Sequence, residues 1–182
     1  GWGRVEYAYY LMAKDCGINI SECKLLEENN RAHFMTKRFD REGNTKHHIQ
    51  SLCGIQHFDF NDMNGYSYEQ LFQTMRLLKL SYPEAEEMFR RMVFNVMARN
   101  CDDHTKNFMF IMDKKGQWKL SPAYDVCHAY RPGSEWVSQH ALSINGKRNN
   151  ISKTDLLDVG KNGYTMCKKC KHSLNRKESP KH

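Results

Sequence analysis

The feature that most constrains this chain is the order of three segments between residues 81 and 125. In residues 81–99 apolar side chains recur every three or four positions, and Ser81 stands where a helix N-cap belongs, so this segment predicts an amphipathic helix. A polar loop follows. Two short apolar segments then flank a turn at residues 113–116, which predicts a β-hairpin. The helix and the hairpin together fix the place of the polar loop.

The polar loop carries the residues with the clearest chemistry. Asp102 and Asn107 have the D-x-x-x-x-N spacing of protein-kinase catalytic loops, where the Asp accepts the proton of a hydroxyl and the Asn binds Mg²⁺. Because a hairpin brings its two ends together, we expect Asn107 and Asp125, just past the hairpin, to bind one Mg²⁺. Asp103 is the competing base, and the spacing favours Asp102. Lys106 would neutralise charge on the transferred phosphoryl group.

Four segments of the sequence resemble the HipA-like serine/threonine kinases, the toxins of HipA/HipB toxin–antitoxin modules. They are residues 100–108 (NCDDHTKNF), 120–125 (LSPAYD), 34–41 (FMTKRFDR) and 139–147 (QHALSINGK). The resemblance ends near residue 160. We therefore expect residues 1–160 to be a partial HipA-like C-terminal kinase domain and residues 161–182 to be a basic, disordered tail.

The resemblance implies an α+β, protein-kinase-like fold, with a small strand-containing N-terminal part, a hinge, and a mainly helical lobe that carries the catalytic hairpin. It implies ATP and Mg²⁺ as cofactors. The backbone of Lys37 and Phe39 would meet the adenine, and Asp40 would meet the ribose hydroxyls. The implied partners are a protein substrate, such as an aminoacyl-tRNA synthetase, and a HipB-like antitoxin.

One departure from kinases lies at the start of the chain. A Gly-rich phosphate loop and a nucleotide-binding strand lysine are expected before the first helix, and neither precedes Glu6. Glu6 is either the acid that pairs with that lysine or an ordinary exposed glutamate. We expect the chain to fold yet to be inactive alone. A non-catalytic pseudokinase or interaction fragment, and a small-molecule phosphotransferase, stay open as alternatives.

The charge of the chain is unevenly distributed. Residues 161–182 hold 7 of the 28 Lys and Arg but 1 of the 21 Asp and Glu, which leaves 21 against 20 for residues 1–160. Because the basic excess is local, we expect no nucleic-acid binding by the folded body. No secretory or membrane-spanning pattern is present, so we expect a cytoplasmic protein. The motif of Cys167 and Cys170 with His172 is a weak zinc pattern.

The remaining elements follow from periodicity and turn residues. Residues 41–66 are polar and rich in Gly and Asn, which predicts a loop with one short helix. Asn145 and Gly146 predict a turn. We further expect helices at residues 5–16, 67–80 and 151–159, and strands at residues 18–26, 33–39 and 136–144.

Overall fold

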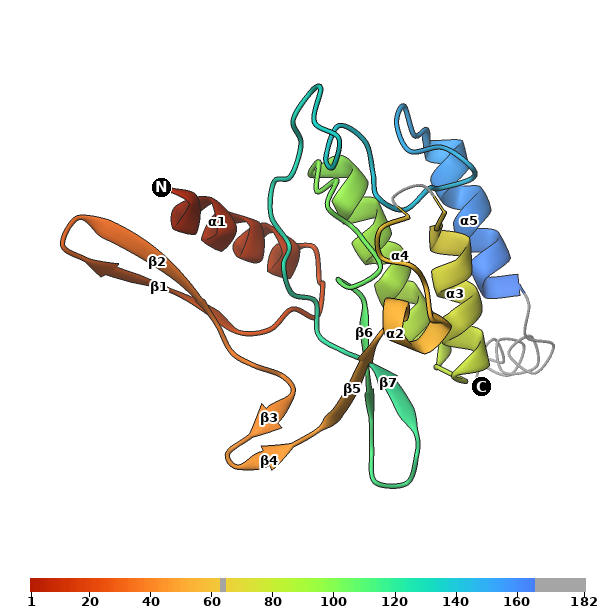
Figure 1. Cartoon of the computed structure of the whole chain (residues 1–182), viewed down its shortest axis with the longest axis horizontal. Coiled ribbons are helices and arrows are strands. Elements are labelled where there is room, and N and C mark those ends of the chain that lie inside the picture. The colour runs from red at the N-terminus through yellow and green to blue at the C-terminus, as the bar shows by residue number, and fades with distance from the viewer. Residues whose placement is uncertain (63–64, 166–182) are drawn as a thin grey trace, which may run out of the picture.

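The computed structural model describes residues 1–62 and 65–165 and contains both helices and small sheets (Figure 1). This confirms the mixed helix and strand content predicted from the sequence. In chain order the elements are α1 (Trp2–Asp15), β1 (Cys23–Glu28), β2 (Arg31–Thr36), β3 (Arg41–Glu42), β4 (Thr45–Lys46), β5 (His48–Ser51), α2 (Leu52–Gln56), α3 (Tyr68–Leu77), α4 (Tyr82–Met97), β6 (Met109–Met112), β7 (Trp118–Leu120) and α5 (Lys153–Thr165).

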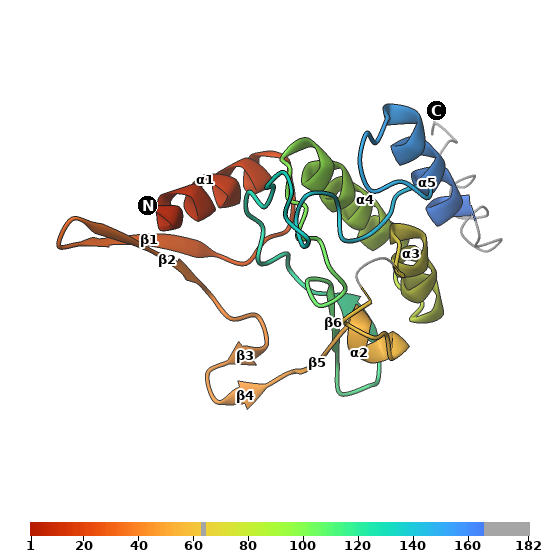
Figure 2. The ribbon, with the colours of Figure 1, turned by 45° about the horizontal axis from the view of Figure 1, so that its top comes forward.

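The N-terminal part consists of α1 and the β1–β2 hairpin, which packs along it (Figure 2). Gly17 follows α1 with a φ of 72°, so it forms a left-handed helix end. Asn29 and Asn30 both have positive φ and make the two-residue turn of the antiparallel hairpin. The two strands are shorter and begin and end elsewhere than expected, but the hairpin itself is confirmed.

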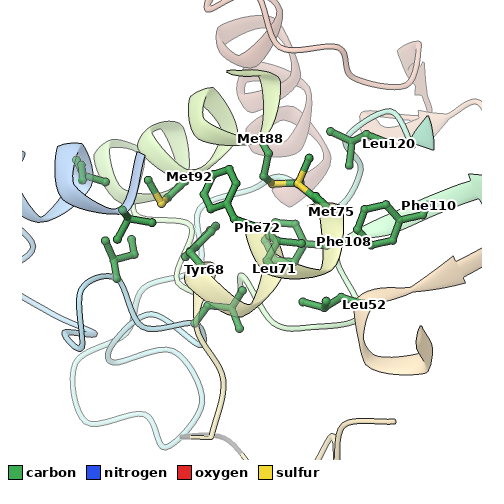
Figure 3. Close-up of a cluster of buried hydrophobic side chains, with 14 residues drawn as sticks. Leu52, Tyr68, Leu71, Phe72, Met75, Met88, Met92, Phe108, Phe110 and Leu120 are labelled. Atoms are coloured by element: carbon green, nitrogen blue, oxygen red, sulfur yellow. The ribbon is translucent and has the colours of Figure 1, made fainter. Parts of the chain in front are cut away.

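The main core lies among α3, α4, α5 and the β6–β7 hairpin (Figure 3). Ser67 caps α3, and Ser81 caps α4 through a reciprocal bond with Glu84, which stabilises both starts. Buried side chains that face one another across these elements include Tyr68, Leu71, Phe72, Met75, Met88, Met92, Phe108 and Phe110. This packing holds the end of α4, and thus the polar loop, in one position.

The prediction of a loop at residues 41–66 is only partly right. The short helix is present as α2, but β3 pairs with β4, and β5 adds a third strand to the β6–β7 hairpin. Strand β5 pairs Ile49 with Ile111, so its partner lies far away in the sequence. Strand β5 was not predicted because it is an edge strand with an exposed side, so its sequence is polar.

The predicted strand at residues 136–144 is wrong. This segment consists of turns and bends, with isolated bridges only at Ser143 and Ile144. Its backbone bonds to scattered partners in place of a neighbouring strand: Ala141 donates to the carbonyl of Cys101, and Ser143 donates to the carbonyl of Tyr66. The predicted turn at Asn145 and Gly146 is present.

Helix α5 continues past the expected boundary at residue 160. The carbonyl of Gly163 accepts a hydrogen bond from Arg76, and a Cβ at Gly163 would lie 3.1 Å from the Phe72 ring, so this turn is packed. The rest of the predicted tail, with Cys167 and Cys170, lies outside the described residues. Within residues 1–62 and 65–165, no helix has the length and apolar character needed to cross a membrane.

Candidate active site

The polar loop leaves α4, enters β6, and is tied to two other segments by its backbone. Arg99 has a left-handed backbone, with a φ of 53°, that ends the helical path. The N–H of Cys101 donates to the carbonyl of Ala129 at 3.0 Å, and the N–H of Cys53 donates to the carbonyl of Thr105 at 3.2 Å. The loop is therefore held at both ends by main-chain bonds.

Asp103 points into the protein. Its side chain is 0% exposed. It accepts hydrogen bonds from the hydroxyl of Tyr68 at 2.8 Å, from the N–H of Ala141 at 2.8 Å and from Nδ1 of His140 at 2.9 Å. Burial would lower the pKa of His140, but the bonds to Asp103 and Cys101 and their charges raise it to about 10. Asp103 thus anchors the polar loop to α3 and to residues 140 and 141.

Asp102 points the other way, with 47% of its side chain exposed. Its backbone carbonyl accepts a hydrogen bond from Nδ2 of Asn107 at 2.8 Å, which holds the main chain of the loop at this residue. Burial raises the pKa of Asp102, His104 opposes this shift, and the negative charges of Asp125 and Asp103 add to it.

The segment before Asp125 is held by both α4 and the chain after α1. Arg91 of α4, with a side chain 8% exposed, donates to the carbonyl of Ser121 at 2.9 Å. The N–H of Ala123 donates to the carbonyl of Asn19 at 2.8 Å. Asp125 itself is exposed and has a left-handed backbone with a φ of 53°. The fold thus presents its carboxylate on a firmly held segment.

Asn107 and Asp125 line the same small cavity, so the hairpin brings the two predicted metal ligands together. The bond from Nδ2 of Asn107 to Asp102 leaves the oxygen of that amide for a ligand. Among the described residues, no group of three or more His, Cys, Asp or Glu could hold a metal ion. Two oxygen ligands still fit Mg²⁺, which keeps several waters and binds substrate phosphates.

Lys106 lies on the Phe60 side of the loop. Its ammonium is 3.3 Å from the centre of the Phe60 ring, a cation–π contact, and its backbone carbonyl accepts a hydrogen bond from the hydroxyl of Tyr124. The side chain is exposed. Lys106 would have to leave the ring to reach a phosphoryl group held by Asn107 and Asp125.

Of Lys37, Phe39 and Asp40, the three residues predicted to bind the nucleotide, Phe39 reaches the site. The ring of Phe39 lies 5.4 Å from that of Tyr124, directly before Asp125. The N–H of Lys37 donates to the carbonyl of Glu22 at 2.7 Å, so it is used within the N-terminal part. Arg38 binds the carboxylate of Asp40 through two nitrogens, and this bond lowers the pKa of Asp40.

Glu6 is half-buried on α1 and has no ion pair among the described residues. Burial is the main cause that raises the pKa of Cys23 and of Cys127, and the negative charge of Glu6 is a smaller cause of both shifts.

A second cavity, of about 80 Å³, lies on the other side of Asp102. Its walls include Asp102, His104 and the aromatic rings of Phe60, Tyr66 and Trp136. The His104 ring lines this cavity and packs against the Phe60 ring, with the two ring centres 5.2 Å apart. No sequence pattern indicated this cavity or the Asp103 contacts, because their residues come from segments far apart in the chain.

Comparison with known proteins identifies a family model and several relatives that match this chain. The model of the HipA-like C-terminal domain family matches residues 2–178. A protein named "Putative kinase" from Haemophilus influenzae is 30% identical over 134 residues, which cover 66% of this chain and 39% of that protein. "Putative kinase Y4dM" from Sinorhizobium fredii is 25% identical over 137 residues, which cover 66% of this chain and 32% of that protein.

Two solved structures share the fold over 100% of this chain. HipA of Shewanella oneidensis, solved with HipB and operator DNA, matches with a TM-score of 0.64 at 18% identity over 51% of its own chain. The Helicobacter pylori proinflammatory kinase CtkA matches with a TM-score of 0.62 at 14% identity over 78% of its chain. The chain spans less than half the length of the two curated relatives. It belongs to the HipA-like C-terminal domain family.

Proposed function

We propose that this chain carries the catalytic centre of a cytoplasmic serine/threonine kinase, which transfers the γ-phosphoryl group of ATP to a hydroxyl of a protein. One observation carries the proposal, namely the opposite placement of two adjacent aspartates. Asp103 is buried and bound by three donors, whereas Asp102 is half-exposed beside a cavity, and the negative charge of Asp125 helps to raise its pKa. This leaves one carboxylate free to act as a base.

In the proposed reaction, Asp102 takes the proton of a Ser or Thr hydroxyl as that oxygen bonds to the γ-phosphorus. The bond from that phosphorus to the bridging oxygen breaks, and ADP leaves with the electron pair. The bond from Asn107 to the carbonyl of Asp102 holds the base in place during this step. The raised pKa of Asp102 makes its carboxylate a stronger base than an ordinary aspartate.

Asn107 and Asp125 would hold Mg²⁺ through their side-chain oxygens. When bound, the ion would offset negative charge on the ATP phosphates. Lys106, once released from Phe60, would add a second positive charge on the hydroxyl side of the loop. Asp102 would otherwise repel the phosphates, so these cations would set where the γ-phosphoryl group can lie.

The nucleotide base is proposed to lie against Phe39, whose ring already contacts Tyr124. The N–H of Phe39 has no hydrogen-bond partner among the described residues and could donate to adenine. Lys37 would contribute its carbonyl, because its N–H is occupied. Asp40 would accept from the ribose hydroxyls with the lone pairs that Arg38 leaves free, and Glu6 would pair with a phosphate-binding lysine.

Family membership and the Shewanella complex suggest a HipB-like antitoxin as a partner, and the family resemblance suggests an aminoacyl-tRNA synthetase as a substrate. Both belong to the proposal for the whole protein. They do not enter the chemistry of Asp102, Asn107 and Asp125, which any hydroxyl-bearing protein segment could use.

The test is transfer of ³²P from labelled ATP with Mg²⁺ to a protein extract, in the protein that contains this chain, followed by phosphoamino-acid analysis. We expect phosphoserine or phosphothreonine, and loss of the signal in Asp102→Asn. Transfer at the wild-type rate by Asp102→Asn would overturn the assignment. Mg²⁺-dependent ATP binding without transfer would instead favour a non-catalytic pseudokinase.

A further inference from the structure

His140 contributes the positive half of the buried pair with Asp103. Its side chain is 7% exposed, and its Nδ1 lies 2.9 Å from Oδ2 of the carboxylate. The next residue, Ala141, donates its N–H to the other oxygen at 2.8 Å. One carboxylate therefore binds two consecutive residues of the same segment, so neither the loop nor that segment can shift without breaking both bonds.

Three further side chains, those of Cys101, Arg148 and Tyr68, contact the pair of His140 and Asp103 or the backbone beside it. Cys101 makes a hydrogen bond to the ring, and the thiol lies on the polar loop as Asp103 does. Arg148 donates to the carbonyl of His140 at 3.3 Å and to that of Ala141. Tyr68, from α3, donates to the same carboxylate oxygen as His140.

The segment held by this pair also forms one wall of the cavity beside Asp102. Residues 139–142 line that cavity together with Asp102 and His104. Asp103 precedes His104 and follows Asp102 in the chain. A single ion pair therefore sets both the position of the proposed base and the position of the wall opposite to it.

We propose that His140 is a positioning residue for phosphoryl transfer: through Asp103 it sets the distance between Asp102 and the wall against which the acceptor hydroxyl would lie. The inference rests on the proposed function of Asp102. His140 lines the cavity beside Asp102, whereas Asp103 lines the cavity of Asn107 and Asp125. We therefore expect the replacement of His140 to act mainly on the acceptor side and less on the nucleotide side.

The test replaces His140 by Gln, which keeps an N–H donor for Asp103 and removes the charge. A misplacement of about 1 Å costs roughly 100-fold in rate, so we expect kcat to fall between about 10-fold and 100-fold. The KM for Mg²⁺-ATP should stay within about twofold of wild type. His33→Gln, on the exposed hairpin, is the matched control and should change neither value.

A double-variant comparison separates positioning from general damage. If His140 acts only through Asp103, then Asp103→Asn with His140→Gln should lower kcat no further than the stronger single variant. Multiplied effects, or a kcat of His140→Gln within twofold of wild type, would overturn the inference. An equal rise in the KM for ATP would mean that the whole site, rather than the acceptor side, had moved.

Nuclear magnetic resonance gives a readout that does not depend on activity. In His140→Gln the amide signals of Asp102 and His104 should shift more than that of Asp125. If the wild-type protein transfers no phosphate, the proposed function fails, and this measurement alone decides whether His140 sets the loop. Unchanged signals at Asp102 and His104 would contradict it.

Discussion

Exchanging each of the two adjacent aspartates for asparagine should separate stability from catalysis. Asp103→Asn removes the negative charge beside a protonated His140 and replaces one acceptor oxygen by a donor, so one of three bonds is lost. Breaking a buried ion pair costs about 3–5 kcal/mol, and release of the His140 proton limits the loss. We expect the free energy of unfolding to fall by about 3 kcal/mol.

Asp102→Asn is the matched change one residue away. The carboxylate is 47% exposed, and Nε2 of His104 lies 3.8 Å away, so the free energy of unfolding should change by no more than about 0.5 kcal/mol. Urea denaturation followed by tryptophan fluorescence measures both values. A loss below about 1 kcal/mol for Asp103→Asn, or a larger loss for Asp102→Asn than for Asp103→Asn, would refute the assignment of anchor and base.

Three further predictions concern the metal, pH and the chain end. Asp125→Asn should weaken Mg²⁺-dependent ATP binding about 10-fold or more in calorimetry, because a neutral amide is a weaker ligand; unchanged affinity argues against a metal role. The raised pKa of His140 stabilises the fold fully below its ordinary value of 6.5, and this stability is lost as pH rises through about 10, so His140→Gln should flatten the fall in Tm between pH 7 and 10. A steep fall that persists in the variant would contradict this. A chain ending at Gly160 should melt several degrees below one ending at Thr165, since it loses the packing of Gly163 against Phe72. Equal melting temperatures would instead support the expected domain boundary at residue 160.

Local sequence patterns were sufficient to predict the elements on which the site depends. The apolar repeat of α4 and the apolar, turn, apolar order of the hairpin each reflect interactions between near neighbours in the chain. Because a hairpin joins its own ends, the meeting of Asn107 and Asp125 could be predicted without knowing the rest of the fold. The spacing that favoured Asp102 over Asp103 agrees with the burial of Asp103.

Interactions between distant segments could not be predicted in the same way. His140 reaches Asp103 across 37 residues, and the alternating pattern around it predicted a strand where the backbone instead bonds to scattered loops. Strand β5 was missed because an exposed edge strand has little apolar signal. Phe60 and Trp136 meet at the cavity beside Asp102 only through the packing of their loops.

The central claim is that one metal–nucleotide site lies at Asp102, Asn107 and Asp125. A crystal structure of the protein with Mg²⁺ and a non-hydrolysable ATP analogue tests it most directly. We predict Mg²⁺ at about 2.0–2.1 Å from an oxygen of Asn107 and an oxygen of Asp125, with the γ-phosphate facing the Asp102 carboxylate. A nucleotide bound elsewhere, or a metal bound without Asp125, would contradict the account.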